Sequence, residues 1–102
     1  MTHELKILPE YFKFVEIGEK KFELRKNDRG FKVGDTILLR EWDPDSEYTG
    51  NAFTARISYV LEDCEEYGLK PGHCILSWKW GRRIRKDYLS QDKIRLSQAS
   101  EL

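Results

Sequence analysis

Apolar and polar residues alternate in short segments along most of this chain, and turn-forming residues separate the segments. The clearest segment spans residues 53–61, where every second side chain is apolar or aromatic. A period of two places those side chains on one face of a β-strand, so we predict one long strand there. Shorter segments of the same kind predict strands at residues 3–8, 21–25, 36–42 and 73–78.

One segment has helical spacing instead. A single helical face is formed by Leu8, Tyr11, Phe12 and Val15. Pro9 suits the first turn of that helix, and Gly18 suits a left-handed end. Polar or acidic residues at 43–51 and 62–72 predict connecting loops. We therefore expect a mainly β fold with one or two short helices, arranged as a small β-barrel.

The distribution of charge divides the chain in two. Its 102 residues suit one domain, and the formal net charge is zero. Residues 1–78 contain 11 Lys/Arg and 15 Asp/Glu, a net charge of −4, whereas residues 79–102 contain 7 and 3, a net charge of +4. We therefore distinguish a body, residues 1–78, from a basic C-terminal extension, residues 79–102.

Composition argues against several classes of protein. Two cysteines, Cys64 and Cys74, are too few for a disulfide framework, and together with His73 they lack the number and spacing of ligands in a zinc site. No apolar run approaches the roughly 20 residues of a membrane span, and the N-terminus lacks the pattern of a signal peptide. We therefore expect a cytoplasmic protein with no membrane partner, no metal and no cofactor.

The motif at residues 18–25 resembles that of a known family. Its residues, Gly-Glu-Lys-Lys-Phe-Glu-Leu-Arg, match the pattern Gly-x-Lys-x-x-(Glu/Thr)-x-Arg of ASCH domains, which belong to the PUA-like superfamily. The Phe-Lys-Val-Gly-Asp turn at residues 31–35 and the preceding strand and helix match as well, so the resemblance covers residues 2–78. The segment from Leu5 to Asp35 is especially similar to an uncharacterised group of short bacterial and phage ASCH-related proteins.

This resemblance implies a compact, mostly antiparallel PUA-like β-barrel with a cleft beside the first helix, lined by Lys20, Glu23 and Arg25. ASCH domains as a group are regarded as RNA-binding modules. One branch acts as an amidohydrolase on acetylated cytidine nucleosides and uses a lysine, a threonine and a glutamate. Lys20 matches that lysine and is our candidate catalytic residue. Glu23 occupies the position of the threonine, and no residue in 62–72 aligns with the glutamate.

The side chains themselves suit a nucleotide ligand, although each has a simpler explanation. Arg25 offers a planar set of donors for a phosphate or a base edge, and Glu23 can accept a hydrogen bond from an exocyclic amine. The same two residues could equally form an ordinary ion pair on a polar strand face. Lys20 follows a helix, where its charge interacts favourably with the helix dipole without any catalytic role.

Two further groups of basic residues are candidate RNA contacts. A positive rim for backbone phosphates is expected from the residues that follow the motif: Lys26, Arg29 and Lys32. In the extension, five of the eight residues at 79–86 are basic. Single-stranded nucleic acid prefers basic residues interleaved with aromatic rings, so we select Trp80, Arg82 and Arg83. The alternative is a solvated tail whose aromatic ring packs on the body.

The leading hypothesis is an RNA- or nucleotide-binding module built around residues 18–25. One alternative is an amidohydrolase that acts on an acetylated cytidine nucleoside. Another is a protein-interaction accessory domain without nucleotide chemistry. We also consider a homodimer formed through the C-terminal extension, because an exposed final strand can pair with a second copy.

Overall fold

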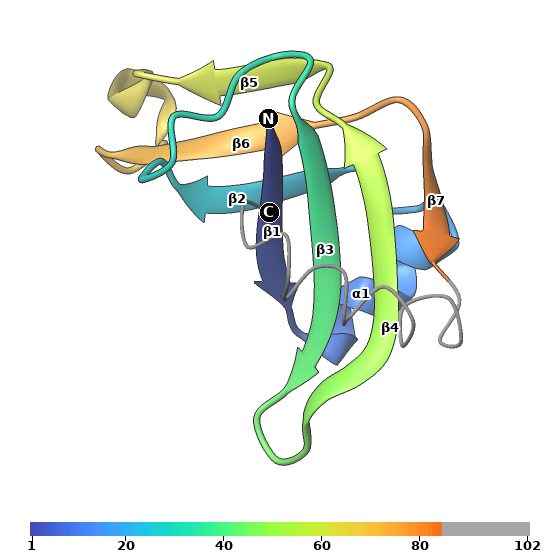
Figure 1. Ribbon diagram of the computed structural model, residues 1–102. Coiled ribbons are helices and arrows are strands. Elements are labelled where there is room, and N and C mark those ends of the chain that lie inside the picture. Colours follow the sequence, from blue (N-terminus) through green and yellow to red (C-terminus); the bar gives the residue numbers. More distant parts are fainter. Residues whose placement is uncertain (85–102) are drawn as a thin grey trace.

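The computed structural model of the chain describes residues 1–84, which form a small β-rich fold (Figure 1). The elements follow one another in the order β1 (Thr2–Ile7), α1 (Pro9–Glu16), β2 (Phe22–Lys26), β3 (Thr36–Asp43), β4 (Glu47–Arg56), β5 (Tyr59–Glu62), a 3₁₀ turn (Glu65–Tyr67), β6 (His73–Ser77) and β7 (Gly81–Ile84). The expectation of a mainly β fold with one or two short helices is confirmed.

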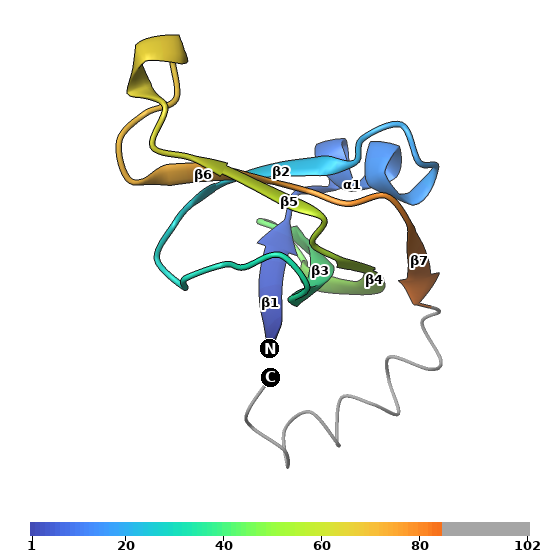
Figure 2. The same ribbon diagram turned by 90° about the horizontal axis from the view of Figure 1, so that it is seen from above.

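The seven strands form two sheets rather than one closed barrel. A four-stranded sheet has the order β1-β3-β4-β7, and a three-stranded sheet has the order β2-β6-β5. Among the strands of residues 1–84, only β1 and β3 pair in parallel. The strands of the two sheets run across one another, and α1 lies beside β2 (Figure 2). Apolar residues from both sheets and the helix share one core: Leu5, Ile7, Phe12, Val15, Phe31, Ile37, Leu39, Phe53, Ala55, Ile57, Cys74, Leu76 and Trp78.

The helix begins and ends where the sequence indicates. Pro9 occupies the first turn, where its missing N–H leaves no hydrogen bond unmade. Phe12 and Val15 are buried and hold this short helix against the core, as a helix of this length requires. Gly18 has φ +80°, a left-handed conformation that glycine adopts without strain. No helix within residues 1–84 is both long and apolar enough to cross a membrane.

The single long strand predicted at residues 53–61 is wrong, because the chain turns a corner in the middle of it. Strand β4 ends at Arg56 in the four-stranded sheet, and β5 begins at Tyr59 in the three-stranded sheet. At the corner, Ile57 N–H donates to the Asp35 carbonyl (2.8 Å) and Ser58 N–H donates to the Ser77 carbonyl (2.8 Å). The apolar alternation in the sequence continues through the corner, but the buried face changes there. Ile57 is buried, whereas Tyr59 is 59% exposed and Val60 packs against the core.

The loop predicted at residues 43–51 is also wrong. Strands β3 and β4 extend into this segment and pair as far as Asp43 and Glu47, so that only a tight turn joins them. The Asp43 side chain accepts a hydrogen bond from Asp45 N–H (2.9 Å) and so stabilises the turn. Polar composition was misleading here because this hairpin projects beyond the core, where both of its faces can be polar.

The predicted strand at residues 73–78 is confirmed as β6, but it is not the last strand. In the extension, β7 pairs antiparallel with β4, and Ile84 packs with Leu38 and Ala52 in a second, small apolar cluster. Gly81 lies so close to β4 that a Cβ atom at this position would overlap the Phe53 ring. The rest of the extension, with the dimer predicted through it, falls outside the described residues.

A buried polar contact joins β1 to the start of β3. His3 is almost fully buried, and its Nε2 lies 2.8 Å from Asp35 Oδ2, while Lys32 N–H donates to the same carboxylate (3.2 Å). The hydrogen bond from His3 is the main cause that lowers the pKa of Asp35 below its ordinary value, the Lys32 amide adds to this effect, and desolvation opposes it.

We predict that this contact contributes to acid sensitivity. Because the folded-state pKa of Asp35 is depressed, its contribution to stability is complete above the unfolded pKa of about 3.9 and is lost as the pH falls through the folded value. Urea unfolding of the wild type between pH 7 and pH 3 should therefore show a steeper loss of unfolding free energy than unfolding of Asp35→Asn. Asp45→Asn, an exposed turn carboxylate, serves as control, and equal slopes for all three proteins would contradict the prediction.

Candidate functional site

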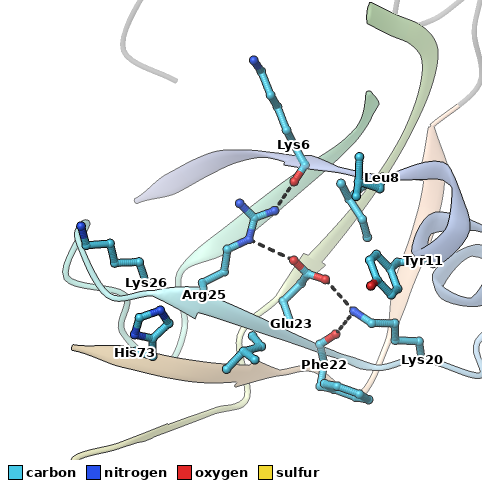
Figure 3. A pocket seen from close by; sticks show the side chains of 11 residues that line it. Lys6, Leu8, Tyr11, Lys20, Phe22, Glu23, Arg25, Lys26 and His73 are labelled. Carbon is cyan, nitrogen blue, oxygen red and sulfur yellow. Dashed lines mark hydrogen bonds and ion pairs between the residues drawn. The ribbon is translucent and has the colours of Figure 1, made fainter. Parts of the chain in front are cut away.

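A pocket of about 620 Å³ lies beside the open edge of β2, facing the end of β1 and the start of α1 (Figure 3). The register explains its location, because β2 is an outer strand of its sheet and β1 is an outer strand of the other. Within residues 1–84, these two edges do not pair with each other as strands. The lining residues are Lys6, Ile7, Leu8, Tyr11, Lys20, Phe22, Glu23, Leu24, Arg25, Lys26 and His73.

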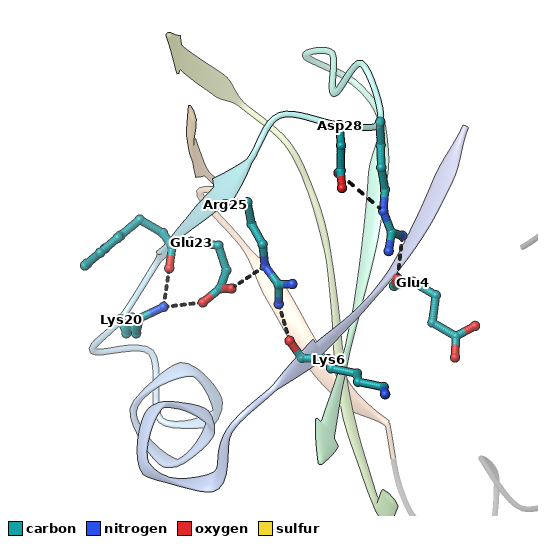
Figure 4. Close-up of polar contacts among 8 residues, drawn as sticks. Glu4, Lys6, Lys20, Glu23, Arg25 and Asp28 are labelled. Atoms are coloured by element: carbon teal, nitrogen blue, oxygen red, sulfur yellow. Dashed lines mark hydrogen bonds and ion pairs between the residues drawn. The ribbon is translucent and has the colours of Figure 1, made fainter. Parts of the chain in front are cut away.

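Three predicted site residues, Lys20, Glu23 and Arg25, form one polar network in this pocket (Figure 4). Glu23 is 7% exposed, and both of its carboxylate oxygens are bound. Oε1 accepts a hydrogen bond from Lys20 Nζ (2.6 Å), and Oε2 accepts one from Arg25 Nε (3.0 Å). A buried carboxylate needs such partners to offset its lost hydration. The prediction that these residues lie together is consistent with this geometry.

Strand β2 turns its polar face inward and its apolar face outward. Phe22 and Leu24 are 48% and 57% exposed, whereas Glu23 between them is buried. The alternation itself follows the sequence, but the usual orientation of an amphipathic strand is reversed. The reversal is possible because the inward face meets the gap between the sheets, where two cations compensate the charge of Glu23.

Arginine side chains connect the open edge of β1 to the other sheet. Arg25 donates from Nη2 to the Lys6 carbonyl, and Arg29 donates from Nη1 to the Glu4 carbonyl (2.7 Å). Both carbonyls belong to the edge of β1 that does not pair with β3. Arg29 therefore donates a hydrogen bond to a strand edge and does not line the pocket. Its Nε atom also lies 4.0 Å from Asp28 Oδ1. Such contacts protect an edge from unwanted pairing.

Donor capacity remains on both cations of the network. Arg25 has five N–H groups, and within residues 1–84 it uses one on Nε and one on Nη2. Lys20 has three and uses two, to the Phe22 carbonyl (2.6 Å) and to Glu23. The remaining N–H groups are held in fixed positions by Glu23, which suits a ligand that carries acceptor oxygens or nitrogens.

Apolar and aromatic groups form the other walls of the pocket. Lys20 Nζ lies 5.8 Å from the centroid of the Tyr11 ring and 4.8 Å from that of Phe22. Tyr11 is 48% exposed, so this residue of the predicted apolar helix face contributes to the pocket and not to the core. A planar ligand with polar edges fits such walls better than a small inorganic ion does.

Sequence reasoning missed two polar residues that line the pocket. Lys6 comes from β1, and His73 comes from β6, where it pairs with Lys26 of β2. From the sequence, His73 suggests only a zinc ligand. Neither residue carries a signal of its own, because strand pairing between distant segments brings it to the site. Lys26 lines the pocket as well, whereas Lys32 is not among its lining residues.

The candidates in the extension lie at a different place. Trp80 is 82% exposed and lines, with Arg82, a second pocket of about 350 Å³ between β4 and β7. Arg83 instead contacts Glu16 of α1 (3.3 Å) and Asn51 of β4 (2.9 Å), so it tethers β7 to the body. The last two residues of the predicted basic segment, at 85–86, lie outside the described residues.

Within residues 1–84, no group of three or more His, Cys, Asp or Glu side chains is arranged to hold a metal ion. Cys74 is buried on the strand that pairs with β2, and burial raises the pKa of its thiol. This thiol therefore behaves as a small apolar core residue.

We predict that Glu23 stabilises the fold as well as the pocket. Glu23→Gln removes the charge that holds two cations in a poorly hydrated position, and we expect the unfolding free energy to fall by about 1–3 kcal/mol. Urea unfolding at pH 7 measures the difference, with Glu19→Gln, an exposed carboxylate in the preceding turn, as matched control. If both variants are as stable as the wild type, the network does not stabilise the protein.

Comparison with known proteins identifies the sequence family of this chain. Residues 2–78 match a family model described as "Domain of unknown function (DUF3850)". An "Uncharacterized 12.9 kDa protein in GpA 3'region" of Escherichia phage P2 is 42% identical over 60 residues, which cover 59% of this chain and 54% of that protein. The chain thus spans about half the length of this curated relative. The family match includes all the residues that line the first pocket and ends before Trp80. Because it covers most of the sequence, the chain belongs to the DUF3850 family.

Proposed function

We propose that the pocket beside β2 binds RNA or a nucleotide. The observation that carries this proposal is that buried Glu23 binds two cations, Lys20 and Arg25, and that both cations keep N–H groups that Glu23 does not use. Fixed cationic donors recognise phosphate oxygens and the acceptor atoms of bases. Because the groups are already positioned, a ligand does not have to order them, which favours affinity.

The remaining lining of the pocket supports the same ligand class. Leu8, Tyr11 and Ile7 offer apolar and aromatic surface for the face of a base. Lys6 and Lys26 are exposed at the pocket, where they can neutralise a phosphate that remains in water. A nucleotide combines a flat apolar ring with charged oxygens, so its two parts match the two kinds of wall.

The resemblance to ASCH domains supports the proposal independently. Lys20, Glu23 and Arg25 are the motif positions that the resemblance placed at a ligand cleft, and these three residues line the pocket. We propose that the two sheets are an open form of the PUA-like barrel, with the gap between β1 and β2 serving as its cleft. Trp80 and Arg82 supply a second contact, by stacking and by charge, for a longer single strand.

We predict that nucleic-acid binding depends on Lys20 and weakens with salt. Fluorescence anisotropy with a labelled single-stranded RNA should show a log K that falls linearly against log salt. Lys20→Ala should lower the affinity about 10-fold or more, the value expected for the loss of one charge-assisted contact. Lys21→Ala, which removes an exposed neighbouring charge, is the matched control. If both variants lose the same affinity, the effect comes from overall charge and not from the position of Lys20. If the wild type binds no RNA, the protein-interaction domain is the remaining hypothesis.

A second candidate function, an amidohydrolase, rests on one contact. Lys20 Nζ lies 2.6 Å from Glu23 Oε1 inside the pocket, and a carboxylate within hydrogen-bond reach can take a proton from an attacking group. Under this proposal Lys20 is the catalytic residue, and Glu23 performs the role of the threonine in the ASCH amidohydrolases.

The amidohydrolase proposal predicts that the protein releases acetate from N4-acetylcytidine. Chromatography of the nucleoside measures this reaction. Lys20→Ala and Glu23→Gln should each lower the rate about 100-fold, which is the ordinary contribution of a general acid–base group. Lys21→Ala should retain full turnover. Turnover that persists in Lys20→Ala would exclude this mechanism, whatever the RNA affinity of the variant.

A further inference from the structure

The main chain of β2 presents unpaired groups to the pocket. Trp78 N–H donates to the Lys21 carbonyl (3.2 Å), and Asn27 N–H donates to the Gly72 carbonyl (2.8 Å). Both pairs continue the register of β2 with β6, so the odd-numbered residues exchange main-chain hydrogen bonds with β6. In an antiparallel pair every second residue points its N–H and C=O groups the other way. The main-chain groups of Phe22, Leu24 and Lys26 therefore face the open edge.

Lys20 already occupies one of these groups. Its Nζ donates to the Phe22 carbonyl, which leaves Leu24 and Lys26 with main-chain donors and acceptors that have no protein partner within residues 1–84. Leu24 lies between Glu23 and Arg25 in the strand, and all three residues line the pocket. Its N–H and C=O therefore form a donor and an acceptor, side by side, next to the polar network.

We propose that the main chain of Leu24 recognises the Watson–Crick edge of the bound base, an inference that rests on the proposed nucleotide-binding function. Every nucleobase carries a hydrogen-bond donor next to an acceptor on that edge, so one N–H and one C=O can pair with it. Recognition through the main chain requires no particular side chain at position 24. It also requires the edge to be free, so the base must come from a nucleotide or a single strand and not from a duplex.

The short length of the available edge favours a base over an added peptide strand. Strand addition uses a row of main-chain groups along an edge, whereas here the Phe22 carbonyl is taken and β2 ends at Lys26. The charged network beside Leu24 also suits a ligand with oxygens and ring nitrogens. An apolar peptide side chain pointing inward at this position would meet the buried ion pairs instead of an apolar pocket.

The test is an NMR titration of ¹⁵N-labelled protein with AMP and, in parallel, with N6,N6-dimethyl-AMP, whose exocyclic donor is blocked. We expect the Leu24 amide proton to move downfield with AMP. The dimethylated analogue should bind about 10-fold more weakly, which corresponds to the loss of one hydrogen bond that leaves its partner unpaired. Lys21→Ala, which removes an exposed charge outside this pocket, should bind AMP within about two-fold of the wild type.

The outcomes separate this inference from the proposed function. If both nucleotides bind equally and only the signals of Lys20 and Arg25 respond, the pocket recognises phosphate. That result overturns the proposed recognition of the base by Leu24 and leaves the proposed nucleotide binding intact. Hexameric single-stranded RNA should shift the Leu24 amide, whereas the same strand in a duplex should not; equal shifts overturn the inference. If no nucleotide or RNA produces any shift, both proposals fail. If an extended peptide alone shifts the amides of residues 22–26, strand addition replaces base recognition.

Discussion

The arrangement of this site depends on one buried carboxylate. Glu23 faces the gap between two sheets, and its charge is tolerated there because Lys20 and Arg25 bind its two oxygens. Once Arg25 is fixed in this way, its guanidinium reaches the edge of β1 and connects β2 to a strand of the other sheet. The same contacts therefore hold the sheets at a separation that leaves a pocket between them, so the stability of the fold and the geometry of the site have a common origin.

The two strand edges that border the pocket differ in whether their main-chain groups have hydrogen-bond partners. On β1 the carbonyls of Glu4 and Lys6 are covered by arginine side chains, whereas on β2 the main chain of Leu24 is open toward the pocket. A protein that needed only to prevent aggregation would gain from covering both edges. One covered edge and one open edge, with a preformed polar network between them, is the arrangement expected where an exogenous ligand completes the hydrogen bonding.

Much of this architecture could be predicted from local patterns, and the failures have a common cause. Alternation identified most strands, the residues around Pro9 and Gly18 identified the helix, and the motif at residues 18–25 brought Lys20, Glu23 and Arg25 into one proposal. The corner at residues 57–58 was missed because apolar residues alternate in the sequence without a break from 53 to 61, although the core-facing side chain changes from Ile57 before the corner to Val60 after it. Lys6 and His73 were missed because only pairing between distant strands brings them to the pocket, and no local pattern records such pairing.

The close approach of Gly81 to Phe53 also bears on how such sequences can diverge. The family match ends at residue 78, yet the strand that follows is fitted to a specific ring on β4. A Cβ atom at position 81 would meet both the Phe53 ring and, at 2.8 Å, the main-chain oxygen of Thr54. A smaller residue at position 53 would relieve only the first contact, and it would leave a cavity in the core. Relatives that retain this seventh strand should therefore keep glycine at position 81, whereas relatives that have lost it lose this constraint at position 81 and still need an apolar residue at position 53 for the core.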